Sequence, residues 1–249
     1  MKLILVTGGT GFLGKKLVEE LDKNNFKLII LTRNKQNIIF KNNKFFKNHI
    51  ILQNNKEDFE KLKKFKNVYG VVHLSTCYGR NGETKKEIYS ANYSYPLNIY
   101  KIIDKKNLKF YLNTDTYFKL GLELPKGLAY YLESKKKFLD KIRLISQKSD
   151  LNMINCRIFQ MYGEGDNKDK FIPNIINKLK NNEPKINLTK GKQRKDFIYV
   201  LDAASAISII VNHHCNNNLK GFHNYEIGSG KTYSIKYIAR HLKFKTKSK

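Results

Sequence analysis

A tyrosine and a lysine in the middle of the chain have the spacing needed for proton transfer. Tyr131 and Lys135 are four residues apart, so a helix would place both side chains on one face. A nearby ammonium lowers the cost of forming a tyrosinate, which allows the phenol to exchange a proton with a substrate. The same spacing is common by chance, as Tyr130 and the lysine run at 135–137 illustrate. Tyr131 and Lys135 alone are therefore weak evidence, and they predict acid–base chemistry only together with further motifs.

A glycine-rich loop near the N-terminus is the second motif. The segment Thr7-Gly8-Gly9-Thr10-Gly11-Phe12-Leu13-Gly14 follows a short apolar run and precedes a helical pattern. Glycines there permit a tight turn, let a pyrophosphate approach the backbone and allow the helix to pack closely on the strand. The start of the helix offers free N–H groups to phosphate. In this strand–loop–helix context the loop predicts dinucleotide binding; the alternative is a turn without a ligand.

The elements that position these motifs alternate along the chain. The pattern predicts strands over residues 3–7, 26–32, 50–53, 68–74, 108–112, 153–159 and 222–227. It predicts helices over residues 12–24, 58–65, 86–104, 127–147, 171–179 and 199–212. Such alternation is typical of the α/β class, here a Rossmann-type doubly wound parallel sheet with a small C-terminal substrate-binding region.

The domain organisation follows from a change of pattern near residue 160. We expect a dinucleotide-binding Rossmann domain over residues 1–160, to which residues 191–213 and 222–228 return. The small substrate-binding region is then formed by residues 161–190 and 229–249. Because the carboxyl ends of parallel strands share one edge, most of the motifs should meet there.

The end of the second strand indicates which nicotinamide cofactor is used. An NAD enzyme usually has Asp or Glu at this edge to hold the ribose 2′-hydroxyl. This chain has Thr32 and Arg33 instead, a hydroxyl and a permanent cation, which suit a 2′-phosphate. The sequence therefore favours NADP as the cofactor over NAD.

The composition is strongly basic, with 48 Lys and Arg against 21 Asp and Glu and a net charge of +27. Nucleic-acid binding, anionic small ligands and coding bias are three competing explanations. The lysines are scattered over every segment rather than gathered on one face, which favours bias and anionic ligands over nucleic acid. No apolar run is long enough to span a membrane and no signal peptide is readable, so we expect a cytoplasmic protein. Cys77, Cys156 and Cys215 are widely separated and predict neither a disulfide framework nor a metal site.

The G-x-x-G-x-x-G spacing, joined to Tyr131 and Lys135, resembles the extended short-chain dehydrogenase/reductase superfamily, the group of nucleotide-sugar epimerases, dehydratases and reductases. The resemblance runs from Lys2 to about His241. It implies a nucleotide-diphosphate-sugar substrate, and a homodimer formed through the helices expected at 86–104 and 127–147.

The resemblance also implies roles for individual residues. The catalytic residues are Thr114, Tyr131 and Lys135, with Thr116 as the alternative to Thr114. The cofactor contacts are Thr7, Gly8, Thr10, Gly11, Phe12, Leu13, Gly14, Thr32, Arg33, Leu74, Ser75, Asn92, Tyr131 and Lys135. The substrate contacts are Thr76, Asp115, Thr116, Gln160, Arg194 and Lys195.

The segment Asn113-Thr114-Asp115-Thr116 narrows the reaction expected from the resemblance. Dehydratases of this group place Glu where this chain has Thr116, so elimination of water is not expected. The segment looks most like that of the 4-keto-reductases that make deoxy sugars for surface polysaccharides, such as abequose and paratose synthases. The preference for NADP inferred from Arg33 also favours a net reduction over epimerisation, because an epimerase shows no net redox change. Two alternatives stay open, an NAD(P)-dependent nucleotide-sugar epimerase and a non-catalytic NADP-binding sensor.

Overall fold

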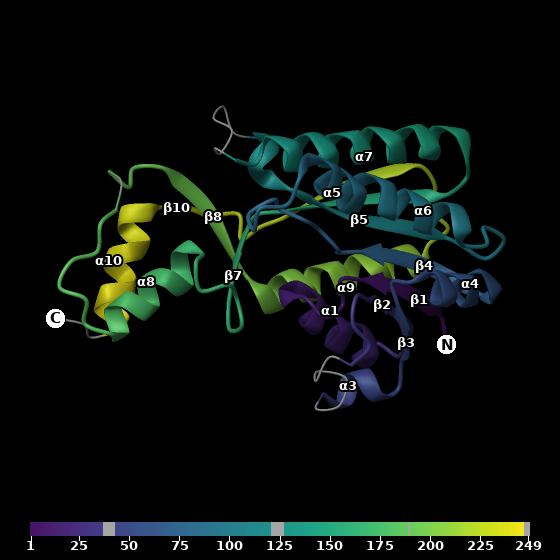
Figure 1. Ribbon diagram of the computed structural model, residues 1–249, viewed down its shortest axis with the longest axis horizontal. Helices are drawn as coiled ribbons and strands as arrows, with labels where there is room; N and C mark the ends of the chain where they lie inside the picture. The colour runs from purple at the N-terminus through teal and green to yellow at the C-terminus, as the bar shows by residue number, and fades with distance from the viewer. Residues whose placement is uncertain (37–42, 121–126, 189, 247–249) are drawn as a thin grey trace.

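The structure is a computed structural model that describes residues 1–36, 43–120, 127–188 and 190–246. In these ranges, seven strands form a parallel sheet in the order β3-β2-β1-β4-β5-β6-β9 (Figure 1). They are β1 (Leu3–Thr7), β2 (Lys27–Thr32), β3 (Ile50–Gln53), β4 (Val68–His73), β5 (Phe110–Thr116), β6 (Asn152–Ile158) and β9 (Phe222–Ile227). The prediction of a Rossmann-type doubly wound parallel sheet is confirmed.

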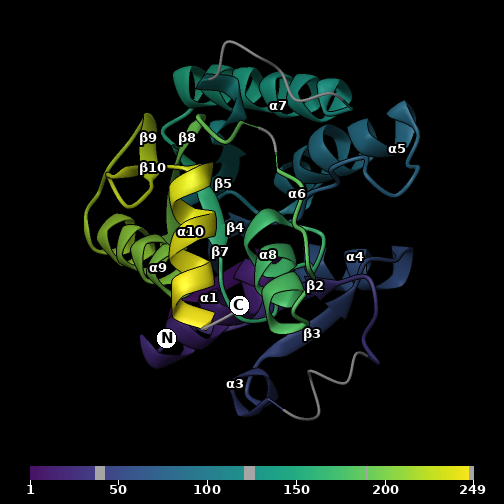
Figure 2. The same ribbon diagram turned by 90° about the vertical axis from the view of Figure 1, so that its left-hand side faces the viewer.

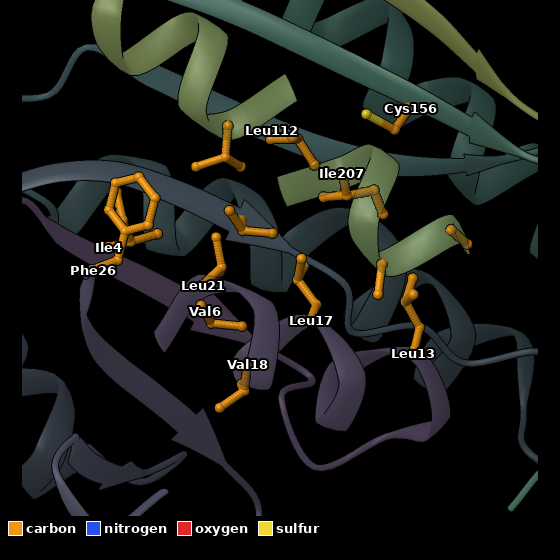
Figure 3. Packing of buried hydrophobic residues seen from close by; sticks show 14 of the residues in the cluster. Ile4, Val6, Leu13, Leu17, Val18, Leu21, Phe26, Leu112, Cys156 and Ile207 are labelled. Atoms are coloured by element: carbon orange, nitrogen blue, oxygen red, sulfur yellow. The ribbon is translucent and has the colours of Figure 1, made fainter. Parts of the chain in front are cut away.

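Helices cover both faces of this sheet (Figure 1). They are α1 (Phe12–Lys23), α3 (Lys44–Lys47), α4 (Lys56–Lys64), α5 (Lys85–Tyr89), α6 (Tyr95–Ile102), α7 (Ala129–Lys148) and α9 (Val200–Asn216). Side chains alternate across a strand, so each buried strand supplies both faces. Ile4 and Val6 belong to the core formed with α1 and α9 (Figure 3), whereas Leu5 belongs to the core formed with α6 and α7. The two-sided burial explains why these strands are continuous apolar runs.

The region expected as one helix over residues 86–104 is helical from Lys85 to Ile102, but its winding changes in the middle. It consists of α5, a π-helical turn at Ser90–Ser94 and α6. Pro96 has no N–H group to donate and clashes with a preceding carbonyl in a helix interior, so it is found in the first turn of α6. The prediction of a helix here is confirmed over residues 85–102, and the π-helical turn within it was not predicted.

A smaller unit lies beyond the carboxyl edge of the large sheet. It holds a three-stranded sheet in the order β10-β8-β7, with β7 (Gln160–Tyr162), β8 (Arg194–Tyr199) and β10 (Thr232–Ser234). Helices α8 (Phe171–Lys180) and α10 (Ile235–Thr246) lie side by side against it (Figure 2). Ile172, Phe197 and Ile235 form its buried core.

We retain the domain division as a proposal, with residue 189 and residues 247–249 of the substrate-binding region lying outside the described residues. The segments proposed to return to the first domain behave differently from one another. β9 joins the large sheet and α9 packs on α1, while β8 belongs to the small sheet. After β7 the chain thus returns to the large sheet once, for α9 and β9, and then leaves it again for β10 and α10.

Candidate active site

A cleft of about 770 Å³ opens at the carboxyl edge of the large sheet, facing the smaller unit. The strand order reverses between β1 and β4, and such a switch point is where ligands bind in open α/β sheets. Most of the residues predicted from the sequence line this cleft: Gly8, Thr10, Gly11, Phe12, Leu13, Gly14, Thr32, Arg33, Leu74, Ser75, Thr76, Thr114, Asp115, Thr116, Tyr131, Lys135 and Gln160. Four others, Thr7, Asn92, Arg194 and Lys195, are not among the lining residues.

The glycine loop is shaped by close backbone contacts. Gly8 has a φ of +71°, and a Cβ there would lie 2.8 Å from the backbone nitrogen of Ser75. A Cβ on Gly14 would lie 2.1 Å from the carbonyl oxygen of Gly8, which accepts a hydrogen bond from the Gly11 N–H at 3.0 Å. Gly11 caps α1 without a side-chain hydrogen bond, so the first N–H groups of the helix are available to a phosphate.

Replacing Gly14 by Ala is expected to destabilise this loop, because the new methyl group meets backbone atoms that cannot move aside. Overpacking of this kind costs about 1–3 kcal/mol of folding free energy, and it should weaken binding of a dinucleotide as well. Gly9→Ala is the matched control, since its Cβ would meet a side-chain methyl of Ile30 at 3.0 Å and its φ is not positive. Thermal unfolding with and without a nicotinamide dinucleotide, NAD(H) or NADP(H), measures both effects. Equal behaviour of the two variants would contradict this account of the loop.

Thr7 lies behind the cleft wall and links the ends of two strands. Its hydroxyl is hydrogen-bonded to Nδ1 of His73 at 2.8 Å and accepts from the backbone N–H of Ser75 at 3.3 Å. Burial, and then the charge of Lys135, hold the pKa of His73 well below its ordinary value. His73 is therefore a neutral, structural side chain that fixes the end of β4 beside the end of β1.

Tyr131 and Lys135 lie on one face of α7, and both are buried at the floor of the cleft. The Lys135 ammonium donates to the carbonyl oxygen of Thr114 at 2.9 Å. Burial, and then the neighbouring Tyr78, raise the pKa of Tyr131 well above its ordinary value, while a hydrogen bond with Thr116 acts in the opposite direction. Tyr131 is thus protonated at neutral pH and able to act as an acid.

The two candidate hydroxyls on β5 have different surroundings. The Thr114 hydroxyl donates to the carbonyl oxygen of His73 at 3.1 Å, which ties β5 to β4. The Thr116 side chain accepts from the backbone N–H of Phe118 at 3.3 Å and also hydrogen-bonds Tyr131. Thr116, named from the sequence as the alternative, is therefore the hydroxyl nearer to the acid.

Asn92 lies in the π-helical turn and is fully buried behind the loop that follows β4. Its side-chain oxygen accepts from the backbone N–H of Cys77, and its NH₂ group donates to the Cys77 carbonyl, both at 2.8 Å. The NH₂ group also donates to the hydroxyl of Ser134 at 3.1 Å. π-helical turns are frequent at functional sites, where they re-aim one side chain. Here Asn92 joins the loop to the helix that carries Tyr131.

The far end of the cleft, where β2 and β3 end, is lined by Thr32, Arg33 and Asn54. Asp58, the acidic side chain near this end, accepts from the backbone N–H of Gln53 at 2.7 Å and pairs with Lys35 and Lys61. Burial acts to raise the pKa of Asp58, but these partners outweigh it and bring the value to about 2. The carboxylate is therefore turned toward lysines rather than into the cleft.

The smaller unit contributes the opposite wall. Gln160 lines the cleft and accepts from the Tyr117 hydroxyl. Lys195 has its ammonium 5.8 Å from the ring centroid of Phe118, which lines the cleft, and burial lowers the pKa of this lysine. Arg194 is exposed and donates to the hydroxyl of Thr232 at 3.1 Å. Of the two cations named from the sequence, Lys195 is the one beside the cleft.

Several lining residues were missed from the sequence because they lie in loops, in the short 3₁₀ helix at Tyr117–Leu120 or just before α8, where no periodic pattern marks them. They are Tyr78, Arg80, Tyr117, Phe118 and Lys170. The position of Tyr78 and Arg80 shortly after β4 could have indicated them, because loops at the carboxyl edge of a parallel sheet supply ligand contacts.

Across residues 1–36, 43–120, 127–188 and 190–246, no group of His, Cys, Asp and Glu is placed to hold a metal ion. In the same ranges, no helix is both long enough and apolar enough to cross a membrane.

Comparisons with known proteins agree with this geometry. The family described as the NAD dependent epimerase/dehydratase family matches residues 4–228. A CDP-abequose synthase of Salmonella muenchen is 32% identical over 99% of this chain and 82% of its own length. A dTDP-4-dehydro-6-deoxyglucose reductase of Escherichia coli is 25% identical over 99% of this chain and 82% of its own length. The UDP-glucose 4-epimerase of Thermotoga maritima has the same fold, with a TM-score of 0.80 at 18% identity over 99% of this chain and 83% of its own.

Proposed function

Since the chain belongs to the NAD-dependent epimerase/dehydratase family and is an NAD(P)-dependent enzyme acting on nucleotide sugars, we propose that it reduces a nucleotide-linked 4-keto deoxy sugar with NADPH. The observation that carries this proposal is that, among the described residues, Arg33 and no carboxylate lines the cleft where β2 and β3 end. A guanidinium suits a 2′-phosphate, and Asp58 is already paired with lysines. Use of NADPH favours net reduction, because an epimerase returns its cofactor unchanged.

The relatives also support a net reduction of a nucleotide sugar. The relatives named CDP-abequose synthase and dTDP-4-dehydro-6-deoxyglucose reductase align over nearly the whole chain. Thr116 stands where dehydratases of this group carry Glu, which disfavours elimination. We extend the proposal to a role in supplying deoxy sugars for surface polysaccharides. A homodimer through α5, α6 and α7 stays a prediction.

The residues of the cleft have distinct tasks in this reaction. The glycine loop would hold a reduced nicotinamide dinucleotide, which would supply the hydride. Tyr131 donates its proton to the carbonyl oxygen of the sugar, and Thr116 orients that oxygen. Lys135, fixed on the Thr114 carbonyl, brings a positive charge to the floor of the site. Lys195 is placed to attract the diphosphate as a point charge.

Turnover with candidate substrates tests the proposal. We expect oxidation of one NADPH for each molecule of a nucleotide-linked 4-keto sugar consumed, with CDP-linked and dTDP-linked sugars tried first. An epimerase would convert its substrate without net NADPH oxidation. A sensor protein would bind NADPH and turn over none of these sugars. Either result would overturn the proposal.

A further inference from the structure

A cation outside the Tyr131–Lys135 pair reaches the same part of the cleft. Arg80 lies in the loop between β4 and α5 and lines the cleft. Its guanidinium carbon is 5.3 Å from the ring centroid of Tyr78, a cation–π distance. The Tyr78 ring is in turn 4.9 Å from the ring of Tyr131, at an interplanar angle of 36°. A continuous series of contacts therefore runs along the cleft from Arg80 through Tyr78 to Tyr131.

The groups around Tyr131 differ in how they act on a negative charge. Tyr78 from the β4–α5 loop and Asp115 from β5 disfavour a tyrosinate, whereas the charge of Arg80 favours it. Lys135, on the same helix as Tyr131, directs its ammonium at the Thr114 carbonyl. Cys77 packs against the apolar cluster that contains Tyr131, and burial raises the pKa of its thiol, which keeps it uncharged.

The charge of Arg80 is available to act on this site. Within the described part of the chain, no carboxylate lies within ion-pair distance of its guanidinium. Burial raises the pKa values of Tyr78 and Tyr117, which also line the cleft, and the charge of Arg80 acts on both in the opposite direction. A cation that has no ion-pair partner among the described residues and acts on three tyrosines of one cleft has an electrostatic role there.

We propose that Arg80, held against the ring of Tyr78, is a positioning residue that stabilises the Tyr131 oxygen as its proton is transferred. This inference rests on the proposed function. In the reduction, hydride from NADPH bonds to the carbonyl carbon and the π electron pair moves to the oxygen. The O–H bond of Tyr131 breaks and its proton bonds to that oxygen, leaving a tyrosinate that regains a proton from solvent. Arg80 acts on this transient negative charge.

The pH profile of sugar reduction provides the first test. Reduction needs protonated Tyr131, so kcat/KM falls as pH rises through the pKa of this residue. Arg80→Met removes a positive charge, destabilises the tyrosinate and raises that pKa. We expect the fall of kcat/KM at alkaline pH, the alkaline limb of the profile, to move upward by about 0.5–1 pH unit. The shift is smaller than a buried ion pair would produce, because Arg80 is exposed and water screens its charge. Arg80→Lys should restore most of the wild-type profile.

Arg143→Met is the matched control. Arg143 lies on the same helix as Tyr131, and its guanidinium carbon is 5.0 Å from the ring centroid of Phe222, but it does not line the cleft. We expect an unchanged alkaline limb. A loss of kcat/KM in Arg80→Met at every pH, with no movement of the limb, would show a merely structural role and overturn the inference.

A second test needs no substrate. The ultraviolet absorbance of tyrosinate is followed as a function of pH in wild type and in Arg80→Met, each with and without Tyr131→Phe. All four proteins carry NADP⁺, because its cationic ring favours the tyrosinate. Subtracting the curve of the protein with Tyr131→Phe leaves the titration of Tyr131 alone. The midpoint of that titration should be at higher pH in Arg80→Met than in wild type. An unchanged midpoint would overturn the inference. A raised midpoint in a protein that reduces no 4-keto sugar would instead refute the proposed function and leave the role of Arg80 standing.

Discussion

Tyr131→Phe is expected to lower kcat for 4-keto-sugar reduction by about 10²–10⁴-fold, the usual loss for a general acid. The phenol is buried at the floor of the cleft and is protonated at neutral pH, so its proton is the one available to the reacting oxygen. Removing the hydroxyl leaves the ring and its packing against Tyr78 in place. NADPH affinity and the unfolding midpoint should therefore stay close to those of the wild type, and steady-state kinetics with calorimetry measures all three.

The neighbouring Tyr130 provides the control for this result. Tyr130 is 47% exposed, and the Lys85 ammonium lies 5.0 Å from its ring centroid. Because this hydroxyl does not line the cleft, Tyr130→Phe should keep full activity. If Tyr131→Phe were as active as Tyr130→Phe, the assignment of the acid would be wrong.

Arg33→Asp is expected to reverse the cofactor preference. A bidentate arginine–phosphate contact supplies two charge-assisted hydrogen bonds, each contributing about 1.5–3 kcal/mol. Its loss, with a carboxylate placed against the 2′-phosphate, should weaken NADPH binding by roughly 100-fold or more. NADH has a ribose 2′-hydroxyl, which the new carboxylate can accept from, so its binding should improve. Fluorescence titration with both cofactors measures the change in preference.

Lys35→Met is the matched control for the loss of a cation at this end of the cleft. Lys35 is two residues away, but its ammonium is paired with Asp58 rather than lining the cleft. We expect the ratio of NADPH to NADH affinity to stay near the wild-type ratio. Equal NADPH and NADH affinities in wild type, or the same loss in both variants, would contradict the role given to Arg33.

The large sheet could be predicted because its signals are local. Each strand is a short apolar run, and the glycine loop has a spacing that few other structures require. The π-helical turn at Ser90–Ser94 was not predictable, because it is stabilised by contacts of Asn92 with a distant loop and helix. The small sheet was missed for a related reason. β8 begins with three charged residues, Arg194, Lys195 and Asp196, which hide an alternating pattern.

The site was predictable where one residue type is needed at one position. Gly14 is an example, since no side chain fits against the Gly8 carbonyl. The choice between Thr114 and Thr116 could not be made from spacing, because both point to the carboxyl edge and their hydrogen bonds separate them. Arg80 left no pattern in the sequence, since its importance comes from contacts across a loop.

Transfer of isotope from stereospecifically C4-deuterated NADPH tests the central claim most directly. Wild-type enzyme is incubated with a nucleotide-linked 4-keto sugar and the labelled cofactor, and the product is analysed by NMR. We predict one deuterium on the carbon that carried the carbonyl group, with an equal amount of NADP⁺ formed. Conversion of a sugar without deuterium at that carbon, or without formation of NADP⁺, would contradict the account.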